Sequence, residues 1–385
     1  MGFHEFSSPY DWSRIAAYKR TAKAAFGGMI DLSVGSPVDP VPDSVRKALA
    51  AAANDPNAYG YPATAGTADL RTAIAEWFSA TRNVDLQAIH ADVVPTVGSK
   101  EGVALMASLL HFGEDDVVVQ PKVSYPTYEI GTQLAGAKVL KVDDVADVAS
   151  WRNVPGVKAV WVNSPCNPTG EVYSAERMAG IVAAAREIGA VVLSDECYAL
   201  MQWRGAVNGA EGEADSLAST PCALRDDVCL GSAEGVLVLY SLSKQSNMAG
   251  YRTAFIAGDY RLVHAMSDYR KQIGQIIPGP VQAAMAAGLR DTQAVRTQWK
   301  RYYDRLARLV EALRAYGYRA SMPDGALYVW VKTLNGDCWA DMAELAKLGI
   351  VPSPGEFYGA VEYLRFSATA SDEAIDAACA RLASA

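Results

Sequence analysis

Residues 93–102 have the sequence Val93-Val94-Pro95-Thr96-Val97-Gly98-Ser99-Lys100-Glu101-Gly102, which predicts a buried strand, a glycine turn and the start of a helix. Short apolar runs separated by amphipathic stretches continue from there to about residue 260, at 117–120, 157–163, 190–194, 236–240 and 254–257. Runs that are apolar on both faces are typical of parallel strands covered by helices. The pattern therefore predicts an α/β fold with a doubly wound, mostly parallel sheet, whose ligand binds beyond the carboxyl ends of the strands.

The pattern changes after Pro278 and predicts a smaller α+β domain. Its expected elements are a long helix at 281–316, a strand at 326–331, a short helix near Leu345, a strand at 363–367 and a terminal helix from Asp372. The first 40 residues are rich in turns and do not form a core of their own, so they pack on the small domain or on a partner subunit. We expect a large domain at 41–279 and a small domain formed by 1–40 with 280–385.

Composition narrows the class of function. The chain has 385 residues, 50% of them hydrophobic, with 35 Lys or Arg against 43 Asp or Glu and a net charge of −8. That balance provides no basic patch for nucleic acid or an anionic membrane, and no apolar run approaches the ~20 residues that span a bilayer. The six cysteines include no Cys-x-x-Cys and the four histidines are scattered, so we expect no metal site and no disulfide framework. No targeting segment is recognisable, and we expect a cytoplasmic enzyme of small-molecule chemistry.

The turn at Gly98 is the first candidate site. A helix that starts after a glycine turn presents unpaired N–H groups and the positive end of its dipole, so Ser99 and Lys100 could bind a phosphate. An ordinary strand-to-helix connection would have the same sequence, and this alternative stays open at this point.

Two further candidates follow predicted strands. Asn167, in Asn163-Ser164-Pro165-Cys166-Asn167-Pro168-Thr169-Gly170, lies in a turn stiffened by two prolines, although asparagine is common in turns for local reasons. Asp195 directly follows an apolar strand, where its carboxylate could pair with a cationic ligand atom. Tyr198 would serve the same site only if the chain bends after Glu196. An exposed Asp-Glu pair at a strand end is the alternative.

Lys244 is the last of these candidates. It follows the buried run 236–240 and the triplet Ser241-Leu242-Ser243, and Arg252 comes eight residues later. A lysine at the edge of a sheet and close to a second cation has a lowered amine pKa, which suits covalent chemistry with a carbonyl group. A solvated loop lysine is the alternative.

Together, in this order, these segments resemble the class I and II aminotransferases of fold type I, which depend on pyridoxal 5′-phosphate. The resemblance covers nearly the whole chain. It includes Tyr61 upstream of Gly66, the Gly98-Ser99-Lys100 turn, Asn167-Pro168-Thr169-Gly170, Asp195 to Tyr198, Ser241 to Lys244 with Arg252, and Arg365 near the end.

The resemblance implies a role for each of these residues. Lys244 would bind the cofactor aldehyde covalently and later move a proton, Asp195 would pair with the pyridine nitrogen, and Asn167 and Tyr198 would hydrogen-bond the phenolic oxygen. Tyr125 would stack on the ring. Arg365 would bind the substrate α-carboxylate, and Gly35 lies in the segment that closes over substrate. The phosphate would be bound by Ser99, Lys100, Ser241, Ser243, Arg252 and, from the other subunit of a homodimer, Tyr61.

These parts imply transfer of nitrogen from an amino acid to a 2-oxo acid. The whole sequence is most similar to the actinobacterial succinyldiaminopimelate aminotransferases of lysine biosynthesis. The expected reaction converts N-succinyl-LL-2,6-diaminopimelate and 2-oxoglutarate into N-succinyl-2-amino-6-oxopimelate and glutamate. The alternatives are an aminotransferase of aspartate or aromatic specificity, a carbon–sulfur β-lyase with the same cofactor, and a non-enzymatic ligand-sensing domain.

Overall fold

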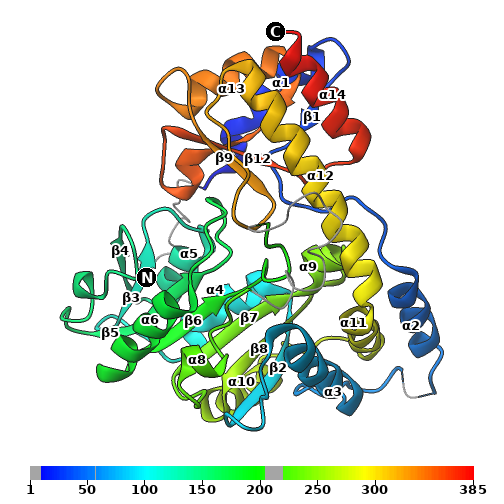
Figure 1. The fold of residues 1–385 in the computed structure, drawn as a ribbon. Helices are drawn as coiled ribbons and strands as arrows, with labels where there is room; N and C mark the ends of the chain where they lie inside the picture. The colour runs from blue at the N-terminus through cyan, green and yellow to red at the C-terminus, as the bar shows by residue number, and fades with distance from the viewer. Residues whose placement is uncertain (1–9, 57, 204–219) are drawn as a thin grey trace, which may run out of the picture.

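The largest feature of the fold is a seven-stranded sheet with the order β2-β8-β7-β6-β5-β3-β4 (Figure 1). The computed structural model describes residues 10–56, 58–203 and 220–385. β8 is antiparallel to both of its neighbours, and the other neighbouring pairs are parallel. The strands are β2 (Ala91–Val97), β3 (Val117–Pro121), β4 (Lys138–Val142), β5 (Val157–Asn163), β6 (Val191–Asp195), β7 (Val236–Ser241) and β8 (Thr253–Asp259).

Both faces of this sheet are buried. In β7, Val236, Val238 and Tyr240 pack into one apolar core, whereas Leu237 and Leu239 pack into the other. The predicted α/β fold with a mostly parallel sheet is therefore confirmed. The helices of this part are α3 (Ala68–Trp77), which continues as a π-helix to Arg82, α4 (Ser99–Leu109), α5 (Thr127–Leu134), α6 (Ala175–Glu187), α8 (Asp226–Cys229), α9 (Leu242–Gln245) and α10 (Tyr260–Gln272).

A second group of elements lies at the other end of the molecule (Figure 1). β11 (Ser353–Pro354), β12 (Tyr363–Ser367) and β9 (Tyr328–Lys332) form an antiparallel sheet, in which Arg365 is opposite Trp330 and Ser367 is opposite Tyr328. β1 (Ile30–Asp31) pairs in parallel with β10 (Ile350–Val351), so the N-terminal segment is built into this group. Its helices are α1 (Ala16–Ala24), α13 (Cys338–Lys347) and α14 (Asp372–Ala383).

The single helix expected at 281–316 is wrong, because the structure has two helices there. α11 (Gly279–Arg290) ends at Asp291, and α12 (Thr292–Tyr316) begins directly after it. Asp291 leaves the helical conformation, and its carboxylate accepts hydrogen bonds from the Ala294 amide and the Ser44 hydroxyl. As the N-cap residue, Asp291 gives a hydrogen-bond acceptor to an otherwise unpaired amide at the start of α12, which favours a break in the helix here. α11 packs against α2 (Asp43–Ala53).

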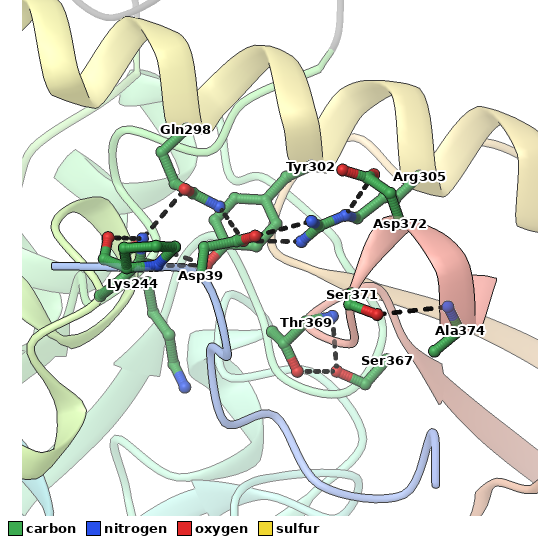
Figure 2. A network of polar contacts seen from close by, with 12 residues as sticks. Asp39, Lys244, Gln298, Tyr302, Arg305, Ser367, Thr369, Ser371, Asp372 and Ala374 are labelled. Atoms are coloured by element: carbon green, nitrogen blue, oxygen red, sulfur yellow. Dashed lines mark hydrogen bonds and ion pairs between the residues drawn. The ribbon is translucent and has the colours of Figure 1, made fainter. Parts of the chain in front are cut away.

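Polar side chains of α12 connect this helix to the segment at Asp39, to the start of α14 and to the turn that contains Lys244 (Figure 2). The buried Arg305 guanidinium donates to both carboxylate oxygens of Asp39 at 2.7 Å, and its Nε donates to Asp372 at 2.9 Å. Burial would raise the pKa of Asp39, but hydrogen bonds from Arg305 and Gln298 outweigh it and hold that pKa below its usual value. The segment that leads to Asp39 is thereby fixed against α12.

The same network supports the turn that contains Lys244. Gln298 accepts a hydrogen bond from the Asn247 amide at 3.0 Å. The single proton of the Tyr302 hydroxyl points at two acceptors, Asn247 Oδ1 at 3.2 Å and the Lys244 carbonyl at 3.4 Å. In Figure 2 the Lys244 side chain extends away from α12, so the helix supports this residue from behind.

Candidate active site

A cavity of about 350 Å³ lies where the two parts of the molecule meet. β5, β6 and β7 end at this edge with Asn163, Asp195 and Ser241, as parallel strands of a doubly wound sheet do. Every site residue predicted from the sequence except Tyr61 lines this cavity. They are Gly35, Ser99, Lys100, Tyr125, Asn167, Asp195, Tyr198, Ser241, Ser243, Lys244, Arg252 and Arg365.

Asp195 provides a buried carboxylate at the end of β6. Tyr128 donates to its Oδ2 at 2.7 Å, and the Cys197 amide donates to its Oδ1 at 3.1 Å. Burial raises the pKa of Asp195 despite these two donors, because an ionised carboxylate loses hydration there. The bend needed after Glu196 is present, since β6 ends at Asp195 and residues 197–200 form a turn. This bend brings Tyr198 to the same cavity.

Lys244 lies in the short helix α9, directly after β7. The Ser241 hydroxyl accepts from the Ser243 amide and so caps this helix. The Lys244 ammonium donates to the Gly35 carbonyl, which brings the N-terminal segment over the site. Burial lowers the pKa of Lys244, and the positive charges of Arg365 and Arg252 act in the same direction. A larger fraction of neutral amine makes this side chain a better nucleophile toward a carbonyl group.

One end of the cavity is built to bind an anion. The amides at the start of α4 lie here, beside the Ser241 and Ser243 hydroxyls, which are 2.7 Å apart. The Arg252 guanidinium lies against Gly98, where a Cβ would overlap it, and the left-handed φ of 78° at Gly98 also favours glycine in this turn. Arg252 itself has a φ of 57°, a left-handed conformation that is costly for a residue with a side chain.

Arg365, which β12 of the small sheet contributes to the cavity, is 4% exposed, and this excludes a solvated surface arginine. Its guanidinium lies over the rings of Tyr328 at 4.0 Å and Tyr358 at 4.7 Å. It donates to Asn167 Oδ1 at 2.7 Å and to the Ser33 carbonyl at 2.8 Å, while its Nε is buried without a hydrogen-bond partner among the described residues. No described carboxylate pairs with it, so a carboxylate ligand would satisfy this charge.

The groups in the cavity fit a phosphorylated heteroaromatic aldehyde. Lys244 offers an amine to the aldehyde, and Asp195 offers a carboxylate to a protonated ring nitrogen. Tyr125 offers an aromatic face, and the start of α4 with Arg252 offers donors to a phosphate. Pyridoxal 5′-phosphate has each of these four parts.

Tyr61 is the one predicted site residue that lies outside the cavity. It is in the connection between α2 and α3, and its side chain is fully exposed in the single chain. No contact among residues 10–56, 58–203 and 220–385 brings Tyr61 to the other site residues.

Sequence reasoning missed several residues that line or support the cavity. Tyr128 lies in the first turn of α5, and no local motif marks its hydroxyl as a partner of Asp195. Tyr328 and Tyr358 come from the small sheet and the turn beside it, and no local motif marks them. The missed residues are Tyr10, Trp12, Val34, Ser36, Tyr128, Asn163, Cys197, Ala249, Tyr328 and Tyr358.

Among the residues that the structure describes, no helix is long and apolar enough to cross a membrane.

The family model for aminotransferases of class I and II matches residues 27–382, and the chain belongs to this family. It is 40% identical to the 4-dedimethylamino-4-oxo-anhydrotetracycline transaminase OxyQ of Streptomyces rimosus, over 97% of this chain and 98% of that protein. It is 30% identical to the LL-diaminopimelate aminotransferase of Dehalococcoides mccartyi, over 97% and 96%. A solved structure of a probable N-succinyldiaminopimelate aminotransferase from Thermus thermophilus superimposes with a TM-score of 0.83 at 26% identity, covering 98% of this chain and 100% of that one.

The chain is therefore a pyridoxal phosphate-dependent aminotransferase of fold type I, as the sequence predicted. Its substrates are an amino acid and a 2-oxo acid.

We predict that Arg365→Lys raises the KM for the amino acid substrate by about 10- to 100-fold, because an ammonium group cannot form the two parallel hydrogen bonds of a guanidinium. Cofactor affinity should change less than about twofold, since Arg365 is not one of the groups that form the anion-binding end. Steady-state kinetics and cofactor titration measure the two effects. Equal losses of substrate affinity and cofactor affinity would contradict a role of Arg365 in binding the substrate carboxylate.

Proposed function

We propose that the enzyme transfers the amino group of N-succinyl-LL-2,6-diaminopimelate to 2-oxoglutarate, giving N-succinyl-2-amino-6-oxopimelate and glutamate in lysine biosynthesis. The main observation in favour of an amino acid substrate is that the buried Arg365 has no carboxylate partner among the described residues. Two similarities favour a diaminopimelate-type substrate. One is to the LL-diaminopimelate aminotransferase and the other is to the probable N-succinyldiaminopimelate aminotransferase.

In this proposal Lys244 binds the cofactor covalently and then moves a proton between the substrate Cα and the cofactor. Its lowered pKa supports both tasks, since a neutral amine accepts a proton. Pyridoxal 5′-phosphate, when bound, supplies an electron sink for the electrons left on Cα. Asp195 keeps the ring nitrogen protonated, and its burial strengthens that ion pair because water does not compete for the carboxylate.

The remaining predicted residues bind and orient. Asn167 and Tyr198 donate to the phenolic oxygen, and Tyr125 stacks on the ring. Arg365 holds the substrate carboxylate while the segment around Gly35 closes the site from the N-terminal side. The phosphate is bound by Ser99, Lys100, Ser241, Ser243, Arg252 and the partner's Tyr61.

A nitrogen-transfer screen with the purified holoenzyme tests the substrate proposal. N-succinyl-LL-2,6-diaminopimelate, LL-diaminopimelate, aspartate and phenylalanine are each offered with 2-oxoglutarate, and glutamate formation is measured. We predict that kcat/KM is highest for the succinylated donor. Preference for unsuccinylated diaminopimelate, aspartate or phenylalanine would contradict it, as would release of pyruvate and ammonia from cystathionine as the main activity.

We further propose a cytoplasmic homodimer. All six cysteines are free thiols, as is usual in a reducing compartment. Tyr59 and Tyr61 are both exposed, at 91% and 103%, in the connection between α2 and α3, and two exposed tyrosines so close together favour a contact with a second chain. Binding of the partner's Tyr61 to the phosphate would then complete the site.

We predict that Tyr61→Phe weakens cofactor affinity about tenfold, because a hydrogen bond to a charged phosphate is lost. Titration of the cofactor-free protein with pyridoxal 5′-phosphate measures this. Tyr59→Phe is the matched control, because it removes a hydroxyl from an equally exposed neighbour and should leave the affinity unchanged. Equal affinities of the two variants, or sedimentation of the wild type as a monomer, would refute the shared site.

A further inference from the structure

Tyr328 connects the small sheet to the turn that contains Tyr198. It is the first residue of β9, it is 2% exposed, and it lies opposite Ser367 of β12 in the small sheet. From there its hydroxyl reaches across the cavity to the Tyr198 hydroxyl, with an oxygen-to-oxygen distance of 2.7 Å. The two rings meet edge to face with centroids 5.7 Å apart. This is a direct hydrogen bond between the small sheet and the turn after β6.

The ring of Tyr328 is held by its other neighbours. The Arg365 guanidinium lies 4.0 Å from its centroid. Gly35 lies so close to the Tyr328 hydroxyl that a Cβ there would overlap it. The hydroxyl position is therefore fixed from both sides, by Gly35 of the N-terminal segment and by Tyr198 of the large domain. A phenylalanine keeps the ring in place over Arg365 and removes only the hydroxyl.

Each tyrosine hydroxyl has a single proton to donate. If Tyr198 donates its proton to the cofactor's phenolic oxygen, as in the proposed function on which this inference rests, it can only accept from Tyr328. We propose that Tyr328 is a positioning residue, whose hydroxyl donates to Tyr198 and thereby orients and strengthens the hydrogen bond from Tyr198 to the cofactor. Hydrogen bonds in such a chain polarise one another, which strengthens the outer one.

This arrangement affects the protonation of the lysine nitrogen that is linked to the cofactor. Once that nitrogen has lost its proton, the phenolic oxygen depends on Tyr198 and Asn167 for hydrogen bonds. Donation by Tyr198 therefore stabilises the unprotonated form and lowers the pKa of the nitrogen. Other titratable or charged groups that face Tyr198, Tyr328 and Lys244 are Tyr10, Tyr125, Cys197, Arg252, Tyr302, Tyr358 and Arg365.

The experiment is a pH titration of the visible absorbance of the holoenzyme without substrate. Tyr328→Phe should move the midpoint upward by about 0.5 to 1 pH unit, the effect of one hydrogen bond. Tyr358→Phe is the matched control. It removes a hydroxyl from the other ring that contacts Arg365, but that hydroxyl bonds to Ser353 at 3.2 Å and not to Tyr198, so the midpoint should stay within about 0.1 unit.

A double variant separates action through Tyr198 from any direct effect. Tyr198→Phe should raise the midpoint further than Tyr328→Phe, and adding Tyr328→Phe to it should change nothing more. An unshifted midpoint in Tyr328→Phe, equal shifts in Tyr358→Phe, or additive shifts in the double variant would overturn the proposal. A wild-type holoenzyme with no visible band at any pH would instead refute the covalent link to Lys244 in the proposed function, so the two failures are distinguishable.

Discussion

The site depends on a buried carboxylate that has no cationic partner among the described residues. Asp195 receives hydrogen bonds from Tyr128 and the Cys197 amide, and burial still raises its pKa. An unpaired buried charge is costly, so this position favours a ligand that brings a positive charge. Asp195 is buried at this position because it is the last residue of β6. The Tyr128 hydroxyl that donates to it is held in place because the Tyr128 ring is stacked on Trp161, with centroids 4.5 Å apart. The rest of the cavity is arranged around the ligand that satisfies this charge.

Three parts of the chain that are distant in sequence complete the cavity. The large sheet contributes Asp195 and Lys244 from the ends of adjacent strands, so their separation is set by strand pairing. The small sheet contributes Arg365 and Tyr328. The N-terminal segment contacts both of these parts, and Arg305 of α12 holds it at Asp39. Tyr302 of the same helix supports the turn that contains Lys244 (Figure 2). One helix, α12, therefore holds both the N-terminal segment at Asp39 and the turn that contains Lys244.

The sequence predicted the buried strands well because each is apolar on both faces. It did not predict β4, an edge strand whose Lys138 and Lys141 are exposed and which lacks that pattern. The break at Asp291 was missed because the apolar spacing continues across it. The Asp291 carboxylate accepts one hydrogen bond from the nearby Ala294 amide and one from Ser44, far away in sequence, and the second could not be read from the local pattern.

The sequence indicated the site residues that follow predicted strands, but not those that reach the site only through tertiary packing. Asp195, Lys244 and Asn167 directly follow predicted strands, so topology alone brings them together. Tyr328 and Tyr358 reach the cavity only because the small sheet is packed over it, and no pattern in one sequence reports that contact. Tyr61 stays a prediction, since a single chain does not test a contribution from a second one.

We expect the Lys244 amine to bind pyridoxal 5′-phosphate covalently beside Asp195. Borohydride reduction of the holoenzyme, followed by proteolysis and peptide mass mapping, shows which lysine carries the cofactor. We predict one pyridoxyl adduct, located on Lys244. An adduct on a different lysine, or none in a protein that transfers nitrogen, would refute this assignment.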